Sequence, residues 1–323
     1  MPSVHAAVSG YGSRRVLRLL LVAFVVSGSL VLAGCGDGEP SGEAEASDPA
    51  ANVVPPDEVQ RRVEAARERL TQNEGGRRVL RAIGAHGGLE AWYRAPTSSY
   101  TWEYANKDAD LRFKSFLVVD NRARQAYHDL LTTGTYDNAQ PVDARFVWDG
   151  ERAWIAPDSI QRPNPRFWAL SGFYFQPIPF VLADPGTNYE ALPDESLDGE
   201  PHDMVQITFG EDVGDSPGDT YTLYLDKETG QVDAIRYTVS YGRDVEPGAD
   251  LPETLFDYGD YVTVHGLTVP THFEGYTYSE ANGPGDSMRN EAFADSISYR
   301  RPFDASNLEP PENARVVPLP GTD

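Results

Sequence analysis

The sequence predicts a mainly β domain of the α+β class, in which short N-terminal helices precede a long antiparallel sheet. Apolar residues recur at helical spacing only between residues 57 and 93, and beyond Pro96 the apolar period changes to two. Clusters of Gly, Pro, Asn and Asp separate the later runs, as hairpin links require. About ten such strands in succession form a meander, which must curl or close to protect its edges.

The helical part begins after Pro55-Pro56, where Asp57 is suited to cap a helix. We expect this helix to end near Gly75-Gly76, a shorter helix to follow around residues 79–83, and a last turn to run from Leu89 to Tyr93. The apolar positions of the first helix recur at helical spacing: Val59, Val63, Ala66 and Leu70.

The strand part begins with Tyr100, Trp102 and Tyr104, which alternate with polar residues. Asp149-Gly150 predicts a two-residue hairpin turn, and further turns are expected at 228–230 and at His265-Gly266. The other predicted strands are 111–119, 123–131, 145–148, 152–156, 204–209, 221–225, 234–241, 254–264, 267–278 and 291–299.

One aromatic segment, from Pro165 to Pro185, does not fit this pattern. Prolines and a glycine interrupt it, so a helical turn or a folded loop is expected there instead of a central strand. Such a segment either fills the concave face of a curled sheet or lines and covers an apolar ligand cavity. Under the second alternative, the candidate residues of the cavity wall are Trp168, Phe173, Tyr174, Phe175 and Phe180.

The N-terminus has the features of a secretory signal, namely arginines at 14, 15 and 18 followed by an apolar run from Leu19. The segment Leu32-Ala33-Gly34-Cys35 resembles the lipobox of bacterial lipoproteins, which implies cleavage before Cys35 and acylation of its thiol. An ordinary signal peptide would leave a lone cysteine in an oxidising compartment, and an uncleaved anchor would need about 20 apolar residues.

Four parts are expected on this basis. Residues 1–34 form the signal peptide, 35–56 a flexible tether rich in Gly, Pro, Ser and acids, 57–310 a single β domain, and 311–323 a C-terminal tail. Gly36 follows the cysteine, and known sorting rules then imply the outer membrane, with the domain facing the periplasm.

The charge is strongly acidic. Removing residues 1–34, which contain three arginines and no acidic residue, changes the net charge from −23 to about −26. Nucleic acid and anionic membrane surfaces would repel such a domain, so the membrane is expected as a partner only through the lipid anchor. Acylation of the single cysteine leaves no thiol for a disulfide, for catalysis or for a metal.

No cofactor and no metal site is predicted. The chain beyond Cys35 has five histidines without metal-binding or nucleophile motifs. His265 and His272 flank a turn and could approach each other, but no third zinc ligand is evident. The acidic loop 211–219 has oxygen ligands at loose spacing without the order of an EF-hand, so a solvated loop is favoured over a calcium site.

Several segments, in this order, resemble LolA/LolB-like lipoproteins of unassigned role over roughly Val79 to Pro310. They are Ala85-His86-Gly87-Gly88-Leu89-Glu90-Ala91-Trp92, Val147-Trp148-Asp149-Gly150, Tyr224-Leu225-Asp226-Lys227-Glu228-Thr229-Gly230 and Gly266-Leu267-Thr268-Val269-Pro270. A further segment, residues 178–186, resembles a subgroup of unknown function. The resemblance implies a strongly curved antiparallel sheet, a half-open β-barrel covered by helices, whose apolar interior receives acyl chains in relatives with known roles.

Two functions follow, from different classes. The first is a non-enzymatic lipoprotein that holds a lipid or other apolar ligand in the concave face. The second is a structural or interaction lipoprotein of the cell envelope whose concave face is filled by its own aromatic residues. An enzyme ranks third, because a catalytic carboxylate pair among fifty acidic residues has no signature in the sequence.

Overall fold

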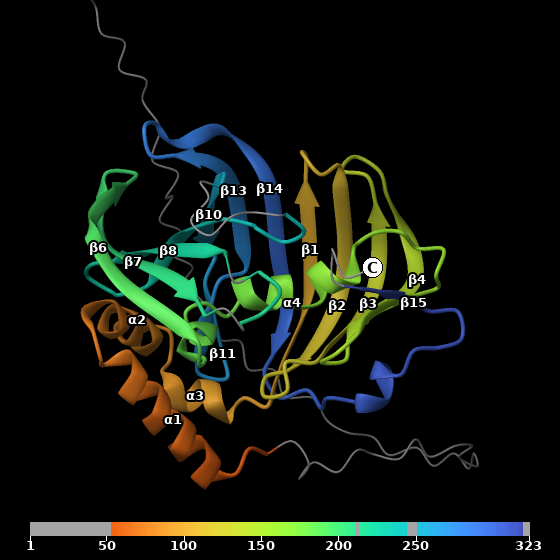
Figure 1. Cartoon of the computed structure of the whole chain (residues 1–323), viewed down its shortest axis with the longest axis horizontal. Coiled ribbons are helices and arrows are strands. Elements are labelled where there is room, and N and C mark those ends of the chain that lie inside the picture. Colours follow the sequence, from red (N-terminus) through yellow and green to blue (C-terminus); the bar gives the residue numbers. More distant parts are fainter. Residues whose placement is uncertain (1–52, 211–212, 217, 244–250, 319–323) are drawn as a thin grey trace, which may run out of the picture.

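The computed structural model describes residues 53–210, 213–216, 218–243 and 251–318 (Figure 1). The expected signal peptide, the lipobox with Cys35 and nearly all of the tether lie outside these residues. Within the described part of the chain, no helix is both long enough and apolar enough to cross a membrane.

Three helices precede the sheet, namely α1 (Pro56–Leu70), α2 (Glu74–Ala85) and α3 (Leu89–Arg94). The prediction that Gly75-Gly76 would end the first helix was wrong, because both glycines lie in the first turn of α2. Asn73 caps this turn through its side chain, which accepts a hydrogen bond from the backbone N–H of Gly76. A Cβ on Gly75 would lie 2.9 Å from backbone atoms of residues 189 and 190, so glycine permits close packing of α2 on the sheet.

The strands form one 13-stranded antiparallel sheet, in the order β15-β5-β4-β3-β2-β1-β14-β13-β10-β9-β8-β7-β6. A separate two-stranded hairpin is formed by β11 and β12. The strands are β1 (Thr97–Asn106), β2 (Leu111–Asp120), β3 (Ala126–Gly134), β4 (Ala139–Trp148), β5 (Ala153–Ala156), β6 (Thr187–Leu197), β7 (Glu200–Phe209), β8 (Thr220–Asp226), β9 (Val232–Tyr237), β10 (Glu253–Gly259), β11 (Val262–Val264), β12 (Leu267–Val269), β13 (His272–Ser279), β14 (Gly283–Ser298) and β15 (Arg315–Val317).

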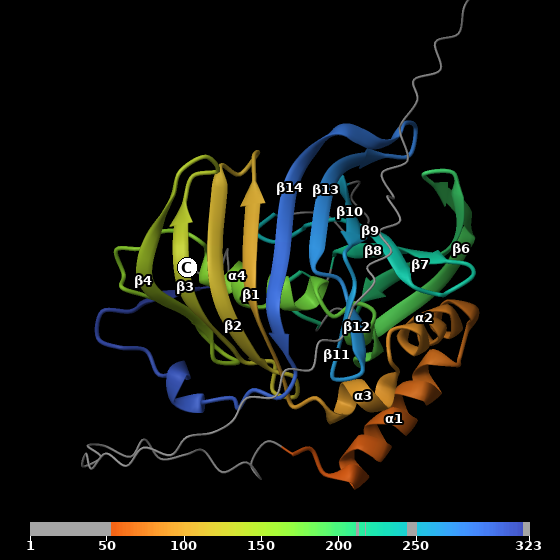
Figure 2. The same ribbon diagram turned by 180° about the vertical axis from the view of Figure 1, so that it is seen from behind.

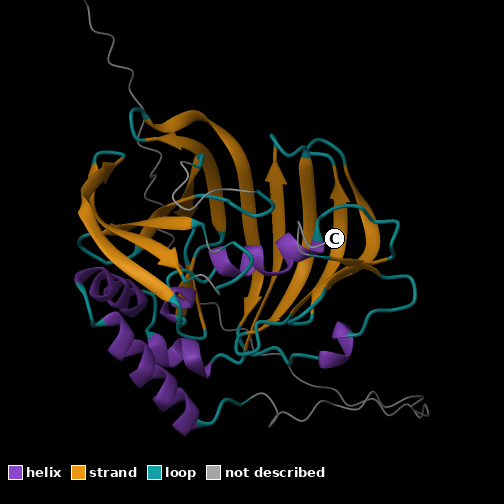
Figure 3. Cartoon of the chain, viewed as in Figure 1, coloured by secondary structure: helices purple, strands orange, loops and turns teal. Residues whose placement is uncertain are grey.

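Two meanders make up the sheet. One runs outward from β1 to β5, and the other returns from β6 to β14, whose residues pair with β1. The chain between β5 and β6 must therefore pass from one edge of the sheet to the other. It contains the helix α4 (Pro165–Phe175) and the short 3₁₀ helix η2 (Phe180–Ala183), and α4 lies across the concave face (Figure 3).

The sheet is strongly curved and does not close into a barrel. Seen from behind, β1, β2 and β14 lie in front of α4, while α1, α2 and α3 lie beside one end of the sheet (Figure 2). The expected mainly β fold, with N-terminal helices and a curved antiparallel sheet, is confirmed.

Three local predictions need correction. Strand β6 was not predicted, because its acidic residues and Pro193 obscure its alternation. The turn after β4 is centred on Gly150 and Glu151, since the N–H of Asp149 donates to the carbonyl of Arg152. The stretch 311–323 was expected to be a tail, but Arg315–Val317 form the edge strand β15, which pairs with β5; residues 319–323 lie outside the described ranges.

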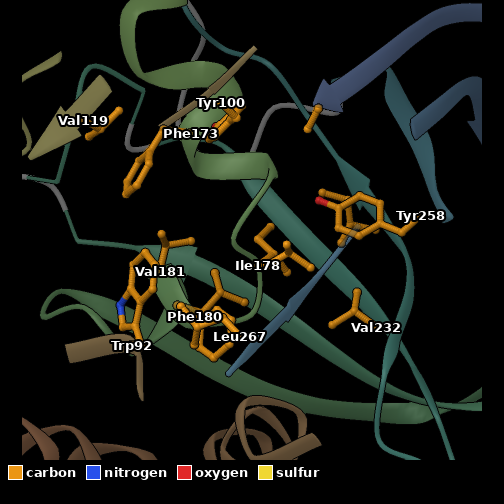
Figure 4. Close-up of a cluster of buried hydrophobic side chains, with 14 of the residues drawn as sticks. Trp92, Tyr100, Val119, Phe173, Ile178, Phe180, Val181, Val232, Tyr258 and Leu267 are labelled. Atoms are coloured by element: carbon orange, nitrogen blue, oxygen red, sulfur yellow. The ribbon is translucent and has the colours of Figure 1, made fainter. Parts of the chain in front are cut away.

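The main core lies between the concave face of the sheet, α4, η2 and the N-terminal helices (Figure 4). Trp92 of α3 stacks on Phe180 of η2, with ring centroids 5.3 Å apart. His86 ties the helices to the sheet: the backbone N–H of Val232 donates to its Nε2, so its Nδ1 carries the proton and donates to the carbonyl of Thr268. Burial lowers the pKa of this imidazole, which is consistent with a neutral structural histidine.

Candidate functional site

The site is organised by α4, which begins after Asn164. The Asn164 side chain accepts hydrogen bonds from the N–H groups of Arg166 and Phe167, and Pro165 occupies the first turn. Two side chains of the sheet hold the helix, one near its middle and one at its C-terminal end. His128 of β3 bonds to the carbonyl oxygen of Ala169 through Nε2 (3.0 Å), and Tyr258 of β10 donates to the carbonyl of Phe175 (2.9 Å).

The inner face of α4 is sealed against the sheet. A Cβ on Gly172 would lie 3.1 Å from the indole of Trp102 on β1, so helix and strand are in close contact. Phe173 is fully buried. Trp168 packs on Tyr104 and Phe113, with ring centroids 4.4 and 5.0 Å away. This half of the concave face is filled by the protein's own side chains.

The imidazole of His128 belongs to the same sealed face. It is buried, it is stacked on Phe146 with centroids 4.1 Å apart, and its Nδ1 lies 3.0 Å from the hydroxyl of Ser115. Burial lowers its pKa to about 3, against the opposing effect of the bond to Ala169. A neutral ring can donate to the Ala169 carbonyl from Nε2 while Nδ1 accepts from Ser115.

The outer face of α4 borders an open cleft instead. Phe167, Leu170 and Tyr174 are spaced three and four residues apart, so they form one stripe, and all three are only partly buried. Between this stripe and strands β7, β8 and β9 lies a cleft of about 650 Å³, within the range of small-molecule sites. Its apolar and aromatic lining includes Trp148, Phe167, Leu170, Tyr174, Phe175, Val181, Leu182, Phe209, Val213, Tyr221, Tyr237, Val239 and Tyr241.

The five candidate wall residues are divided between the two faces. Tyr174 and Phe175 line the cleft, whereas Trp168, Phe173 and Phe180 lie outside its lining. Phe173 and Phe180 belong to the core around Trp92. Sequence reasoning missed the wall contributed by the sheet, including Tyr221 and Tyr237. These tyrosines are inward-facing strand residues, and nothing in the sequence separates them from ordinary core residues.

Arginines gather where α1, the turn after β2 and the chain after η2 meet at the cleft. Arg62, Arg122 and Arg124, here called the arginine cluster, all line it. Arg124 pairs with Asp184 and donates to the carbonyl of Asn121, and Arg122 lies 3.0 Å from a carboxylate oxygen of Glu58. The guanidinium of Arg62 lies over the ring of Tyr93, 4.3 Å from its centroid.

A fourth arginine lies near the start of α4. Arg166 makes a two-pronged ion pair with Asp215, at 2.5 and 2.7 Å, and its guanidinium lies 4.0 Å from the ring centroid of Trp148. Asp215 belongs to the loop that was considered for calcium. Another member, Asp219, accepts a bond from the N–H of Ser240, and burial raises its pKa. Residues 211, 212 and 217 of that loop lie outside the described ranges.

The two histidines considered for zinc have separate partners. His265 accepts a hydrogen bond from the N–H of Tyr299, while His272 bonds to Glu291 across β13 and β14 at 3.0 Å. Glu274 is close to the latter pair, so the ligand atoms of the three side chains lie within 4.8 Å of one another. The hydrogen bond between His272 and Glu291 accounts for their approach without a cation.

The sequence matches no known protein-family profile, and no curated protein matches it. Solved structures give similarities of fold. A LolA superfamily protein from Nitrosomonas europaea aligns with a TM-score of 0.46 and 10% identity, over 74% of this chain and 99% of that one. A DUF1329 family protein from Desulfovibrio piger aligns with a TM-score of 0.44 and 11% identity, over 78% and 97%.

A domain from Vibrio parahaemolyticus, provisionally named an outer membrane lipoprotein-sorting protein, gives a TM-score of 0.35 at 12% identity, over 77% and 97% of the two chains. With TM-scores of 0.46 and less, these likenesses carry no conclusion about ligand, partner or activity. The architecture that the sequence resemblance implied, a curved sheet that is not closed into a barrel, is the one observed.

Proposed function

We propose that this protein is a non-enzymatic lipoprotein of the cell envelope that holds a lipid or another apolar ligand in the cleft between α4 and strands β7 to β9. Its anchor is the acylated Cys35 and its location is the outer membrane, facing the periplasm. Binding of this kind requires an apolar surface and a cavity, without cofactor or catalytic residue.

The observation that carries the proposal is the partly exposed apolar stripe of α4. Phe167, Leu170 and Tyr174 face a cleft of about 650 Å³, although Gly172 and Phe173 on the opposite face of the same helix are buried. A helix that only filled space would bury both apolar faces, because each exposed aromatic side chain forgoes the free energy of burial. An apolar ligand in the cleft would cover this surface.

The test is a titration of the full chain carrying Cys35→Ser, taken from the soluble fraction, with the neutral fluorescent probe N-phenyl-1-naphthylamine. We expect saturable binding at micromolar concentration. Leu170→Gln places a polar group in the cleft and should weaken binding about tenfold, since burial of an unpaired amide costs about 1–3 kcal/mol.

Leu131→Gln is the matched control, because Leu131 is 43% exposed on β3 and does not line the cleft. It should leave probe affinity unchanged. Native mass spectrometry of the same protein should show co-purified lipid. If the protein carries no lipid and binds no probe, the ligand-binding proposal is wrong, and the alternative of a structural or interaction lipoprotein takes its place.

The anchor is tested separately. Cys35→Ser should release the protein from membranes or leave an uncleaved precursor, because the lipobox cysteine is the only cysteine in the chain. Stable anchoring usually needs more than one acyl chain, so loss of the acylation site should remove the retention that depends on lipid. Labelled fatty acid is the readout, and equal incorporation into wild-type and variant protein would contradict the assignment.

A further inference from the structure

Building on the proposed function, we infer that the ligand of the cleft is an amphiphile with an anionic headgroup, held by the arginine cluster of Arg62, Arg122 and Arg124. The apolar chain lies along the stripe of α4, and the carboxylate or phosphate of the headgroup lies against the guanidinium groups. This identifies a class of ligand that an apolar cleft alone does not specify.

The first support is an imbalance of charge at this end of the cleft. Asp184 acts electrostatically on Arg62, and Arg124 repels Arg62 while it pairs with Asp184. Arg69 belongs to the same group, since it acts together with Arg62 and Arg124 on Tyr93. Asp184 and Glu58 are the carboxylates that act on Arg62 or pair with Arg122 and Arg124, so the arginines outnumber them here. Asp215 and Asp219 also line the cleft, where they bond to Arg166 and to the N–H of Ser240.

The second support is that the arginines differ in the hydrogen bonds and ion pairs that their guanidinium groups already make. Arg69 donates to the carbonyl of Ala183, and Arg124 is held by Asp184 and by the carbonyl of Asn121. Arg62, by contrast, has no hydrogen bond and no ion pair among the described residues, and its contact is the face of Tyr93. A half-buried guanidinium with no carboxylate in ion-pair contact is costly, and burial lowers the pKa of Arg62 accordingly.

The third support is the fit of the chemistry. A guanidinium presents several N–H donors in a fixed plane, which matches the paired oxygens of a carboxylate or phosphate. The cation–π contact with the ring of Tyr93 helps to hold the guanidinium of Arg62 in place. Arg122 is exposed at the cleft, and its guanidinium has several donors, so an anionic headgroup can contact it while Glu58 stays paired with it.

The experiment is displacement of N-phenyl-1-naphthylamine from the Cys35→Ser chain by four ligands with a straight chain of twelve carbons, which in laurate includes the carboxyl carbon. Laurate and dodecyl phosphate carry the anionic groups, dodecanol is neutral, and dodecyltrimethylammonium is cationic. We expect laurate or dodecyl phosphate to bind about tenfold or more tightly than dodecanol, which corresponds to a hydrogen bond with a charged group, and the cation to bind weakest. The order of the two anions distinguishes a free fatty acid from a phosphate headgroup.

Arg62→Gln should lower the affinity for the two anions about tenfold and leave the affinity for dodecanol unchanged. Arg61→Gln is the control, because Arg61 directly precedes Arg62 in α1, is exposed, is paired with Asp57 and does not line the cleft. Arg122→Gln gives a second, exposed position if Arg62→Gln does not fold. Equal affinity for all headgroups, or the same loss in Arg61→Gln and Arg62→Gln, would overturn this inference and leave the cleft as an apolar site. Failure of the probe itself to bind would overturn the proposed function instead.

Discussion

The two faces of α4 meet the same curved sheet in opposite ways. Toward β1, β2 and β3 the helix is sealed: Gly172 touches the indole of Trp102, and Phe173 is buried. Toward β7, β8 and β9, the stripe with Leu170 and Tyr174 stands away from the sheet and leaves a cleft. The side chains on both faces are apolar, so hydrophobicity does not distinguish them. The difference lies in the small residues of the inner face, which allow the helix to approach one half of the sheet.

The largest expected effect is a difference in stability between variants of two phenylalanines of α4, which lie two residues apart. Phe173→Ala should lower the free energy of unfolding by about 3–5 kcal/mol, as large-to-small changes in a packed core do. Phe175→Ala should lower it by less than half of that, because its side chain is only partly buried, and should weaken probe binding more strongly. Urea unfolding and probe titration of both variants measure this. Equal losses of stability would show that the cleft side is packed as tightly as the sealed side.

The next effect concerns pH and the sealed face. His128 has a pKa of about 3 in the folded protein, against an ordinary value of 6.5, so between these values the unfolded chain binds the proton and the folded one does not. The stability that the neutral imidazole confers is therefore complete above pH 6.5 and is lost as the pH falls, by about 1.4 kcal/mol per unit. His86 titrates in the same direction.

Between pH 6.5 and pH 5, we expect the loss from His128 to reach about 2 kcal/mol. His202 opposes it, because Asp233 raises its pKa above the ordinary value despite burial, so its contribution is lost as the pH rises instead. Urea unfolding midpoints of the wild-type protein and of His128→Gln, each measured at pH 5 and pH 7, isolate the contribution of His128 to the pH dependence of stability. An unchanged pH dependence in the variant would show that this imidazole titrates normally.

The smallest effect tests how close α4 lies to the sheet. Gly172→Ala would place a Cβ 3.1–3.2 Å from several atoms of the Trp102 ring, which is itself buried. Overpacking of this size should lower the free energy of unfolding by about 1 kcal/mol. Gly84→Ala on α2 is the control, since nothing lies within 4 Å of its Cβ, and helix propensity should make it stabilising by up to about 1 kcal/mol. A stabilising Gly172→Ala would mean that helix and strand can separate freely.

Sequence periodicity predicted the class of fold well, because alternation over many runs admits few other structures. It failed at β6, where partly exposed acidic residues conceal the strand. The turn at Gly150 was placed one residue early, because the side chain of Asp149 accepts bonds from the N–H groups of Glu151 and Arg152 and shifts the turn.

The candidate site was predicted only in part. The aromatic segment was recognised, but its helical phase was not, and phase decides that Tyr174 borders the cleft while Phe173 enters the core. A helix assumed to begin at Pro165 would have placed Phe167, Leu170 and Tyr174 on one face. Arg62 was not predicted, since an arginine in an amphipathic helix is ordinarily a surface charge, and only the tertiary structure brings it beside Arg124 and Asp184.

The pairing of β1 with β14 has a consequence for the rate of folding. Trp102 lies opposite Ala294 in this ladder, so its formation closes a loop that contains most of the domain. Each meander can form from neighbouring strands, but their junction must await a contact between residues far apart in the chain, and such contacts slow folding. We therefore expect the junction to form last. Until it does, β1 and β14 each present an unpaired edge, at which a second copy of the chain can pair in place of the correct strand.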